Sequence, residues 1–340
     1  MMTNNQDGDT ESLKQRIIKE LKFSAKKNQY ISGEVLCNKL NISRSAVWKH
    51  IQSLRKKGYK IISATNKGYK LIEVPDLLLP EELRVGLETK IIGSVIRYFS
   101  ELSSTNEEAR RLADEGAHEG LVLIAETQSK GRGRLGRQWF SPRGGLWLTI
   151  VLRPKIAPNH APLLTLLSGV AVARCIRDTA GLKATLKWPN DVRIKGKKVC
   201  GILTEMRAEQ DVINYVLIGL GINVNLSVKQ FPKDLRKMVT SIQEETNKEI
   251  KRIVFTQELL KEFEQEYVIF CKDTIRRIPE VIRTWRSLSD TLGRNVMVET
   301  SVGTLKGLAA DIAEDGALVI ITETGEEHKI VAGDCIYLNQ

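Results

Sequence analysis

Residues 130–142 read Lys-Gly-Arg-Gly-Arg-Leu-Gly-Arg-Gln-Trp-Phe-Ser-Pro. The segment contains the Gly-x-Gly-x-x-Gly spacing of dinucleotide-binding proteins, in which the glycines directly follow a strand and open a helix whose amino terminus holds the phosphates. Here Gln128 and Ser129 separate the segment from the strand-like run before it, and Pro142 with Gly144-Gly145 prevents a helix after it. The sequence therefore excludes a Rossmann-type dinucleotide site.

The same segment is strongly basic. Residues 130–143 contain five Lys and Arg side chains and no Asp or Glu. Glycine allows the backbone to fold closely around an anion, and arginine makes charge-assisted hydrogen bonds to carboxylate and phosphate. The pattern predicts a mobile loop that clamps an anionic ligand, and the alternative is a basic loop without a fixed structure.

Strand-like and helical patterns alternate on both sides of this loop. Strands are expected at residues 94–100, 121–127, 145–153, around 186, 199–207 and 215–224, and helices at residues 105–116, 162–179 and within 256–288. This alternation predicts a mixed α/β domain. After Leu292-Gly293 the chain consists of short β-prone runs interrupted by glycines, which predicts a small β barrel.

The first part of the chain has the pattern of three helices and a hairpin. An apolar helical stripe lies near the start, and Ser32 and Ser43 can cap two further short helices. Two β-prone pieces, residues 59–63 and 68–72, are joined by a polar turn. This spacing predicts a winged helix-turn-helix domain, followed by a linker near residues 74–80.

The charge of the chain is unevenly distributed. The net charge of +11 includes +9 in residues 1–75 and −5 in residues 293–340. Between Lys22 and Lys70 there are 12 basic residues and one acidic residue. Such an excess predicts a polyanionic partner, with nucleic acid as the leading candidate.

The second helix of the pair and the hairpin offer candidate DNA contacts. Side chains that reach base edges and phosphates are expected at Arg44, Ser45, Lys49, Gln52, Lys67 and Lys70. The alternative is that the helix pair packs in an ordinary bundle, where the lysines only keep its outer face soluble. Trp48 is expected in the core rather than stacked on a base.

Length and composition limit the remaining possibilities. A chain of 340 residues with 42% hydrophobic residues is expected to form two or three globular domains. Its five cysteines and four histidines show no paired or ligand-type spacing, so the thiols are expected to be reduced and any metal to arrive with a nucleotide. No apolar run is long enough to span a bilayer, and the amino terminus shows no charged-then-apolar leader, so the expected location is the cytoplasm.

A second set of motifs lies outside the basic loop. It comprises Ser103–Asn106, Gln128, a Lys-Trp-Pro-Asn-Asp run at 187–191, Lys198 and a Gly-Leu-Gly-Ile-Asn run at 219–223. With the basic loop, these motifs resemble the biotin protein ligase family over residues 80–338. The helix-turn-helix region extends the resemblance to the bifunctional subclass that is both ligase and biotin-dependent repressor. The Arg-Arg-x-Ser-Gly-Gly-Gly element of lipoate ligases is missing from the sequence, which favours biotin over lipoate.

The resemblance implies an architecture and a reaction. The implied domains are a winged helix-turn-helix DNA-binding domain (1–74), a mixed α/β biotin- and ATP-binding catalytic domain (75–291) and an SH3-like β barrel (292–340). Biotin and Mg-ATP would give biotinyl-5′-AMP and pyrophosphate, and a lysine of a biotin carboxyl carrier or carboxylase domain would accept the biotinyl group. The adenylate would act as corepressor of biotin synthesis and transport genes, with a homodimer on operator DNA.

The resemblance also assigns site residues. Catalytic roles fall to Lys198, Arg132, Arg134 and Asp191. Biotin contacts fall to Ser104, Thr105, Asn106, Gln128, Arg132, Gly133, Arg134 and Lys198. ATP and adenylate contacts fall to Arg134, Trp139, Asn190, Asp191 and Asn223, with Mg²⁺ expected to arrive with ATP and to lie near Asp191 if a side chain contacts it.

Several of these residues have a simpler alternative role. Ser104 occupies a position typical of a helix cap, Asn190-Asp191 suits a polar turn, Trp139 could anchor the loop as core, and Lys198 could be a solvated lysine. For the whole chain, the alternative function is a transcription factor whose central domain senses a ligand without catalysis.

Overall fold

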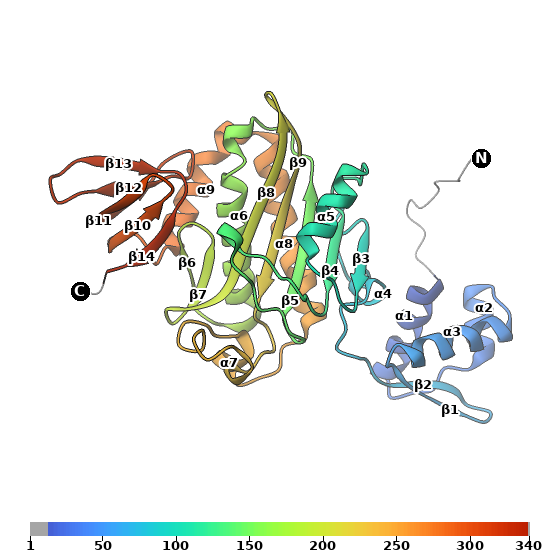
Figure 1. Cartoon of the computed structure of the whole chain (residues 1–340). Helices are drawn as coiled ribbons and strands as arrows, with labels where there is room; N and C mark the ends of the chain where they lie inside the picture. Colours follow the sequence, from blue (N-terminus) through green and yellow to red (C-terminus); the bar gives the residue numbers. More distant parts are fainter. Residues whose placement is uncertain (1–12, 339–340) are drawn as a thin grey trace. The chain divides into compact units, whose positions relative to one another are not determined.

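The computed structural model describes residues 13–338, and the chain divides between Leu87 and Glu88 into two units. The elements of the first unit are α1 (Leu13–Lys26), α2 (Gly33–Leu40), α3 (Arg44–Lys56), β1 (Lys60–Ala64), β2 (Gly68–Glu73) and α4 (Pro80–Leu83) (Figure 1). The hydroxyl of Ser32 accepts a hydrogen bond from the Val35 amide at 3.1 Å, and that of Ser43 accepts one from the Ala46 amide at 3.2 Å. Both predicted caps are confirmed, and the helix pair with its antiparallel hairpin is a winged helix-turn-helix.

The segment after the hairpin is attached to the first unit by α4. Glu82 is buried, accepts a hydrogen bond from the Tyr59 hydroxyl at 2.6 Å and pairs with Lys22 of α1. Its neighbour Glu81 pairs with Lys57. These contacts place α4 in the first unit, whereas the domain boundaries after residues 74 and 291 stay predictions.

The predicted position of Trp48 is wrong. The buried stripe of α3 consists of Val47, Ile51 and Leu54, and Trp48 lies beside it with 55% of its surface exposed. Because successive helical residues are rotated by about 100°, a residue next to the stripe can point to solvent however apolar it is.

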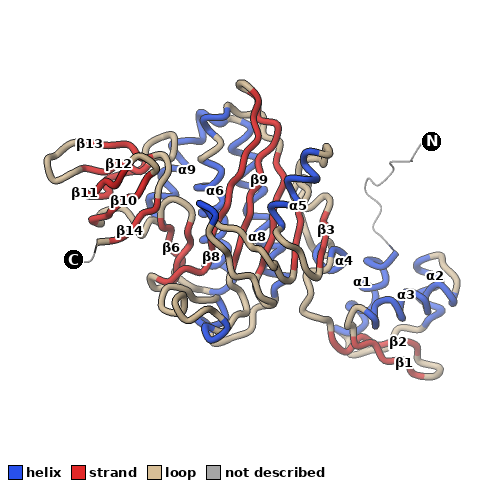
Figure 2. The backbone as a smooth tube through the Cα atoms, viewed as in Figure 1, coloured by secondary structure: helices blue, strands red, loops and turns tan. Residues whose placement is uncertain are grey.

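The second unit contains a seven-stranded sheet in the order β3-β4-β5-β9-β8-β7-β6 (Figures 1 and 2). Its strands are β3 (Ile96–Phe99), β4 (Val122–Ala125), β5 (Leu146–Leu152), β6 (Ala184–Lys187), β7 (Asp191–Ile194), β8 (Lys197–Glu209) and β9 (Val212–Ile222). Only β3 and β4 are parallel neighbours in this sheet; its other neighbours are antiparallel. The expected mixed α/β architecture is confirmed.

Helices cover both faces of this sheet. The helices of the unit are α5 (Thr105–Asp114), α6 (Leu163–Ala180), α7 (Ile242–Thr246), α8 (Arg252–Lys272) and α9 (Thr274–Leu288). On β8, the Thr204 hydroxyl accepts a hydrogen bond from the Thr165 hydroxyl of α6. The next residue, Glu205, accepts a hydrogen bond from Asn106 of α5. Successive strand residues point to opposite faces, so α5 lies on one face and α6, with α8 and α9 packed on it, on the other.

The end of the chain forms a second antiparallel sheet in the order β13-β12-β11-β10-β14. Its strands are β10 (Asn295–Thr300), β11 (Gly303–Ile312), β12 (Leu318–Ile321), β13 (Glu327–Ile330) and β14 (Asp334–Tyr337). The prediction of a small C-terminal β domain is confirmed. Within the described residues the strand pairs form an open sheet whose edges are β13 and β14, so closure into a barrel is not confirmed.

Two further structural expectations can be compared with the model. No helix within residues 13–338 has the length and apolarity needed to cross a membrane. The basic segment is not followed by a helix, in agreement with the exclusion of a Rossmann site.

Candidate ligand-binding and catalytic site

A cavity of about 650 Å³ lies on the α5 face of the large sheet. It is lined by residues from the sheet, the basic loop and β14. Every residue assigned above to catalysis, biotin or adenylate lines it: Ser104, Thr105, Asn106, Gln128, Arg132, Gly133, Arg134, Trp139, Asn190, Asp191, Lys198 and Asn223. The fold thus brings together residues from all six of the motifs described above.

One end of the cavity is lined by uncharged polar groups. Gln128 Oε1 accepts hydrogen bonds from the Thr105 amide at 2.8 Å and the Thr105 hydroxyl at 3.1 Å. Asn106 Oδ1 accepts from the Thr149 hydroxyl at 2.6 Å, and its Nδ2 donates to Glu205 at 2.8 Å. Ser104 is the N-cap residue of α5, as its position predicts, but its side chain makes no capping hydrogen bond and lines the cavity. These groups hold one another in place and suit a neutral polar ligand head.

The floor of the cavity consists of glycines on adjacent strands. A Cβ at Gly219 would lie 2.2 Å from Asn106 Oδ1, and one at Gly221 would lie 2.4 Å from Trp139 Nε1. Gly201 of β8 faces Gly221 across the ladder, and its Cβ would lie 2.9 Å from the Trp139 ring. Gly219 and Gly221 lie on the same face of β9 because they are two residues apart. They let α5 and the basic loop approach the sheet closely, and their spacing in the sequence was a signal for this contact.

Lys198 lies at the beginning of β8 and is paired. Its Nζ is 2.5 Å from Asp191 Oδ1 and 5.1 Å from the centroid of the Trp139 ring. Its backbone is held on both sides, since its amide donates to the Met238 carbonyl at 2.8 Å and its carbonyl accepts from the Thr240 amide at 2.9 Å. The solvated-lysine alternative therefore does not describe this side chain.

The basic loop, which we call the arginine loop (residues 130–141), is a hydrogen-bonded hairpin. Its ladder includes bonds from the Gly133 amide to the Arg137 carbonyl at 2.7 Å and from the Trp139 amide to the Gly131 carbonyl at 2.8 Å. At its tip Leu135 has a φ of 54° and is 73% exposed. The loop in this structure thus has the hydrogen bonds of a regular hairpin.

The three arginines of the loop have different partners. Arg132 pairs with Glu107 of α5 at 3.3 Å. Arg134 donates to Asn190 Oδ1 and to the Gly333 carbonyl, both at 3.2 Å, and burial lowers the pKa of its guanidinium below the ordinary value. Arg137 forms an ion pair with Asp334 of β14.

Two buried polar atoms at the cavity lack a partner among the described residues. They are Asn223 Oδ1 and Trp139 Nε1. Asn223 is 1% exposed, and its Nδ2 donates to the Thr240 carbonyl at 2.9 Å. An unsatisfied buried polar atom costs about 1–3 kcal/mol, so both atoms suit hydrogen bonds to a ligand.

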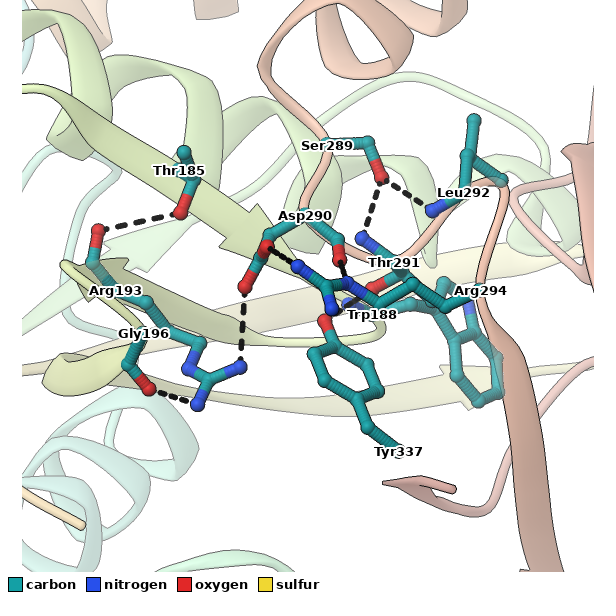
Figure 3. Close-up of polar contacts among 10 residues, drawn as sticks. All are labelled: Thr185, Trp188, Arg193, Gly196, Ser289, Asp290, Thr291, Leu292, Arg294 and Tyr337. Carbon is teal, nitrogen blue, oxygen red and sulfur yellow. Dashed lines mark hydrogen bonds and ion pairs between the residues drawn. The ribbon is translucent and has the colours of Figure 1, made fainter. Parts of the chain in front are cut away.

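The Lys-Trp-Pro-Asn-Asp turn is attached to the beginning of the C-terminal sheet (Figure 3). The Trp188 amide donates to the Thr291 hydroxyl at 2.9 Å, and this hydroxyl is 3.0 Å from that of Tyr337. Arg193 of β7 donates to Asp290 at 3.1 Å. Asn190 therefore lies in a turn, as the simpler alternative stated, whereas Asp191 is the first residue of β7, and both side chains line the cavity.

Several cavity residues were not assigned from the sequence. Lys187 lies 5.0 Å from the Tyr337 ring centroid, and burial lowers the pKa of its ammonium group. Its place in the 187–191 run was the available signal. Arg137 lies within the arginine loop, which was the signal for its place in the cavity. No sequence pattern indicated Asp334 or Cys335, because only the tertiary fold brings them to the cavity.

The candidate DNA contacts belong to the first unit. Arg44, Ser45, Lys49 and Lys67 are exposed, and Gln52 and Lys70 are partly buried. Lys70 donates to Asn28 Oδ1 at 2.6 Å. A shallow groove on α3 is lined by Trp48, Lys49, Gln52, Ser53 and Lys56.

Potential metal ligands do not cluster. Within the described part of the chain, no group of three or more His, Cys, Asp or Glu side chains could hold an ion. Asp191 is the acidic side chain nearest the predicted catalytic lysine, and Lys198 already neutralises it.

Known proteins are similar both to single segments of this chain and to most of its length. The Biotin/lipoate A/B protein ligase family model matches residues 98–223, an HTH domain model matches residues 14–70, and the Biotin protein ligase C terminal domain model matches residues 291–337. The bifunctional ligase/repressor BirA of Bacillus subtilis (strain 168) is 41% identical, over 92% of this chain and 95% of that protein. The chain belongs to the biotin protein ligase family.

The chain is also similar to more distant members of this family. The bifunctional ligase/repressor BirA of Escherichia coli (strain K12) is 29% identical, over 86% of this chain and 88% of that protein. The structure of the biotin protein ligase from Aquifex aeolicus in complex with biotin and ATP matches with a TM-score of 0.61 at 29% identity. The match covers 72% of this chain and 99% of that one.

Proposed function

We propose that this chain is an ATP-dependent biotin protein ligase and a DNA-binding repressor. It forms biotinyl-5′-AMP and transfers biotin to a lysine of a biotin carboxyl carrier or carboxylase domain, and the adenylate is its corepressor. The observation that carries the ligase function is the cavity itself, in which Lys198 and the arginine loop stand beside a neutral polar pocket.

The first step joins two anions. A carboxylate oxygen of biotin attacks the α-phosphorus of ATP, the new O–P bond forms, and pyrophosphate leaves. In the second step the acceptor lysine amine attacks the carbonyl carbon and AMP leaves, so the enzyme needs no nucleophile of its own. Lys198, Arg132 and Arg134 spread the negative charge that otherwise opposes the approach.

The two ends of the cavity suit the two ends of the adenylate. Ser104, Thr105, Asn106 and Gln128 offer the donors and acceptors that a ureido ring requires. We assign the nucleotide to Asn190, Asp191, Trp139 and Asn223, which also line the cavity, and the unpaired Asn223 Oδ1 can accept a hydrogen bond there. Mg²⁺ would be held mainly by the phosphates of ATP and would neutralise phosphate charge there, and Asp191, which pairs with Lys198 in this structure, is the acidic side chain that we assign to it.

Biotin-dependent exchange of pyrophosphate into ATP tests this proposal. The ligase should exchange label only when biotin is present. A chain that binds biotin but exchanges nothing would be a ligand-sensing transcription factor, the alternative function.

Operator binding should depend steeply on salt. The winged helix-turn-helix with its +9 charge supports a phosphate-dominated interface, for which log affinity falls with log salt by about 0.9 per phosphate contacted. Lys49→Ala should reduce this slope by about one. Lys248→Ala, an exposed lysine of the second unit, is the matched control. Binding to DNA upstream of biotin genes that does not respond to salt would contradict this interface.

We also propose that the adenylate promotes dimerisation. A single winged helix reads one half-site, and two-fold dimers place two recognition helices in successive major grooves. If ligand binding at the arginine loop favours the dimer, sedimentation with biotin and ATP should show about twice the monomer mass at concentrations where DNA binding increases. An unchanged mass at those concentrations would mean that dimerisation is not the switch.

We also propose that the protein is cytoplasmic, and we propose its domain boundaries and the fold of its C-terminal domain. The five cysteines are free thiols, as expected in a reducing cytoplasm. We place the domain boundaries after residues 74 and 291 and assign the C-terminal sheet to the SH3-like barrels, for which the match of residues 291–337 to the C-terminal domain of biotin protein ligases is the support.

A further inference from the structure

A large apolar side chain stands on the exposed face of α3. Trp48 is 55% exposed and lines the shallow groove of this helix together with Lys49, Gln52 and Lys56. Residues three and four positions apart lie on the same side of a helix, so Trp48 and Gln52 are neighbours on this face. An indole ring therefore lies at the surface where the winged helix-turn-helix offers its candidate DNA contacts.

The charge around Trp48 favours an anionic partner over an apolar protein surface. The helix α3 contains four Lys and Arg side chains and no Asp or Glu. Arg55 donates to the Ile61 carbonyl at 2.8 Å and so connects the helix to β1. Within residues 13–338, Lys49 and Lys56 have no hydrogen-bond or ion-pair partner. These two ammonium groups suit phosphates, whereas an apolar protein surface would have to remove their water.

The position of Trp48 in the helix favours contact with bases. It lies four residues after Arg44, the first residue of α3. In helix-turn-helix proteins, the amino-terminal part of the second helix contacts base edges in the major groove. The base pairs present hydrogen-bonding groups there, and thymine alone adds an apolar group, its C5 methyl. An indole ring at this position can bury that methyl group, which the other three bases lack.

We propose that Trp48 is a specificity-determining residue that recognises thymine in the major groove by packing its ring on the C5 methyl group. This inference rests on the proposed repressor function, which supplies the operator DNA. The ring lies outside the buried stripe of α3, so its contribution is to the choice among DNA sequences.

A cycle that combines a protein substitution with a DNA substitution tests the proposal. The parent protein, with biotin and ATP, first selects its tightest duplexes from a random library. Thymines of the selected half-sites are then replaced one at a time by uracil, which lacks only the methyl group. At one or more positions the affinity of the parent protein should fall about fourfold, the effect of burying one group of this size.

Trp48→Ala should remove this response. The variant should bind the thymine duplex less tightly than the parent protein does, and the same uracil replacement should change its affinity by less than about twofold. Trp48→Phe keeps an aromatic ring and should keep part of the response. Because Trp48 is exposed, the thermal midpoint of Trp48→Ala should stay close to that of the parent protein, so weaker binding would not reflect unfolding.

Phe23→Ala is the matched control. Phe23 is an aromatic residue of the same unit with the same exposed fraction, 55%, but it lies on α1. The variant should respond to uracil as the parent protein does. An equal loss of the response in Phe23→Ala would show that the effect does not belong to the α3 face, and would overturn the proposal.

Three further results would overturn it. One is a set of selected half-sites without thymine, and another is an affinity for the thymine duplex that Trp48→Ala leaves unchanged. The third is a uracil response of equal size in the parent protein and in Trp48→Ala, which would place the ring on sugar or phosphate. Each of these leaves the repressor function intact. A parent protein that retains no duplex would instead overturn the repressor function, and this inference with it.

Discussion

Lys198→Ala should slow adenylate formation by about 10²- to 10³-fold, the loss typical of removing one group that stabilises developing charge in a transition state. Lys198 is the cation that we assign to this role, because its backbone is fixed by hydrogen bonds to Met238 and Thr240 and its side chain lines the cavity. The measurement is the rate of biotin-dependent pyrophosphate exchange at saturating ATP and biotin.

The fold should survive this change. The Lys198–Asp191 pair is partly exposed, and such pairs contribute about 0–1 kcal/mol to stability, so the thermal midpoint should shift little. Lys197→Ala is the matched control, since Lys197 is the exposed neighbour on the same strand and should retain the parent rate. A near-normal exchange rate in Lys198→Ala would remove this residue from the catalytic machinery.

Arg134→Gly should release the activated intermediate at least about tenfold faster than the parent protein. Hydrogen bonds to charged groups contribute about 1.5–3 kcal/mol each, and 1.4 kcal/mol corresponds to a factor of ten. Arg134 is partly buried and donates hydrogen bonds to Asn190 and to the Gly333 carbonyl, so its guanidinium reaches the cavity from an anchored position. Released biotinyl-5′-AMP should then label lysines of a bystander protein that is not a natural acceptor.

The release can be followed directly by separating preformed adenylate complex from free ligand. Arg143→Gly changes an exposed arginine just beyond the loop and should leave both release and selectivity as in the parent. If Arg134→Gly still biotinylates only the acceptor domain, the arginine loop does not act as a lid over the intermediate.

Local patterns predicted much of the fold. Ser32 and Ser43 cap their helices because the cap hydrogen bond joins residues three apart, which requires no tertiary contact. The strands of the large sheet other than β7 were likewise expected from apolar runs, and their positions differ from the prediction by a few residues at the ends. The strand β7 (Asp191–Ile194) was not predicted, because its first residue was interpreted as part of the polar 187–191 turn. Trp48 is a further exception. It was expected in the core because it is apolar, whereas its position in the helix places it beside the buried stripe.

The residues of the candidate site were recognised as motifs, and their assigned roles stay predictions. Their meeting in one cavity depends on strand order, because β7, β8 and β9 become neighbours only in the folded sheet. The glycines of the cavity floor were likewise visible in the sequence, whereas their contacts were not. Gly219 and Gly221 could be recognised from their spacing, but their contacts with Asn106 and Trp139 required the fold.

Caps, periodicity and charge segregation were thus encoded locally, because each depends on residues within one or two turns or on composition alone. Only the tertiary structure decided that Glu205 supports Asn106, that Thr291 supports the Trp188 turn and that Asp334 meets Arg137. These partners lie 99, 103 and 197 residues apart. Polar side chains at such separations have many possible partners in the sequence, and the packing of the apolar core selects among them.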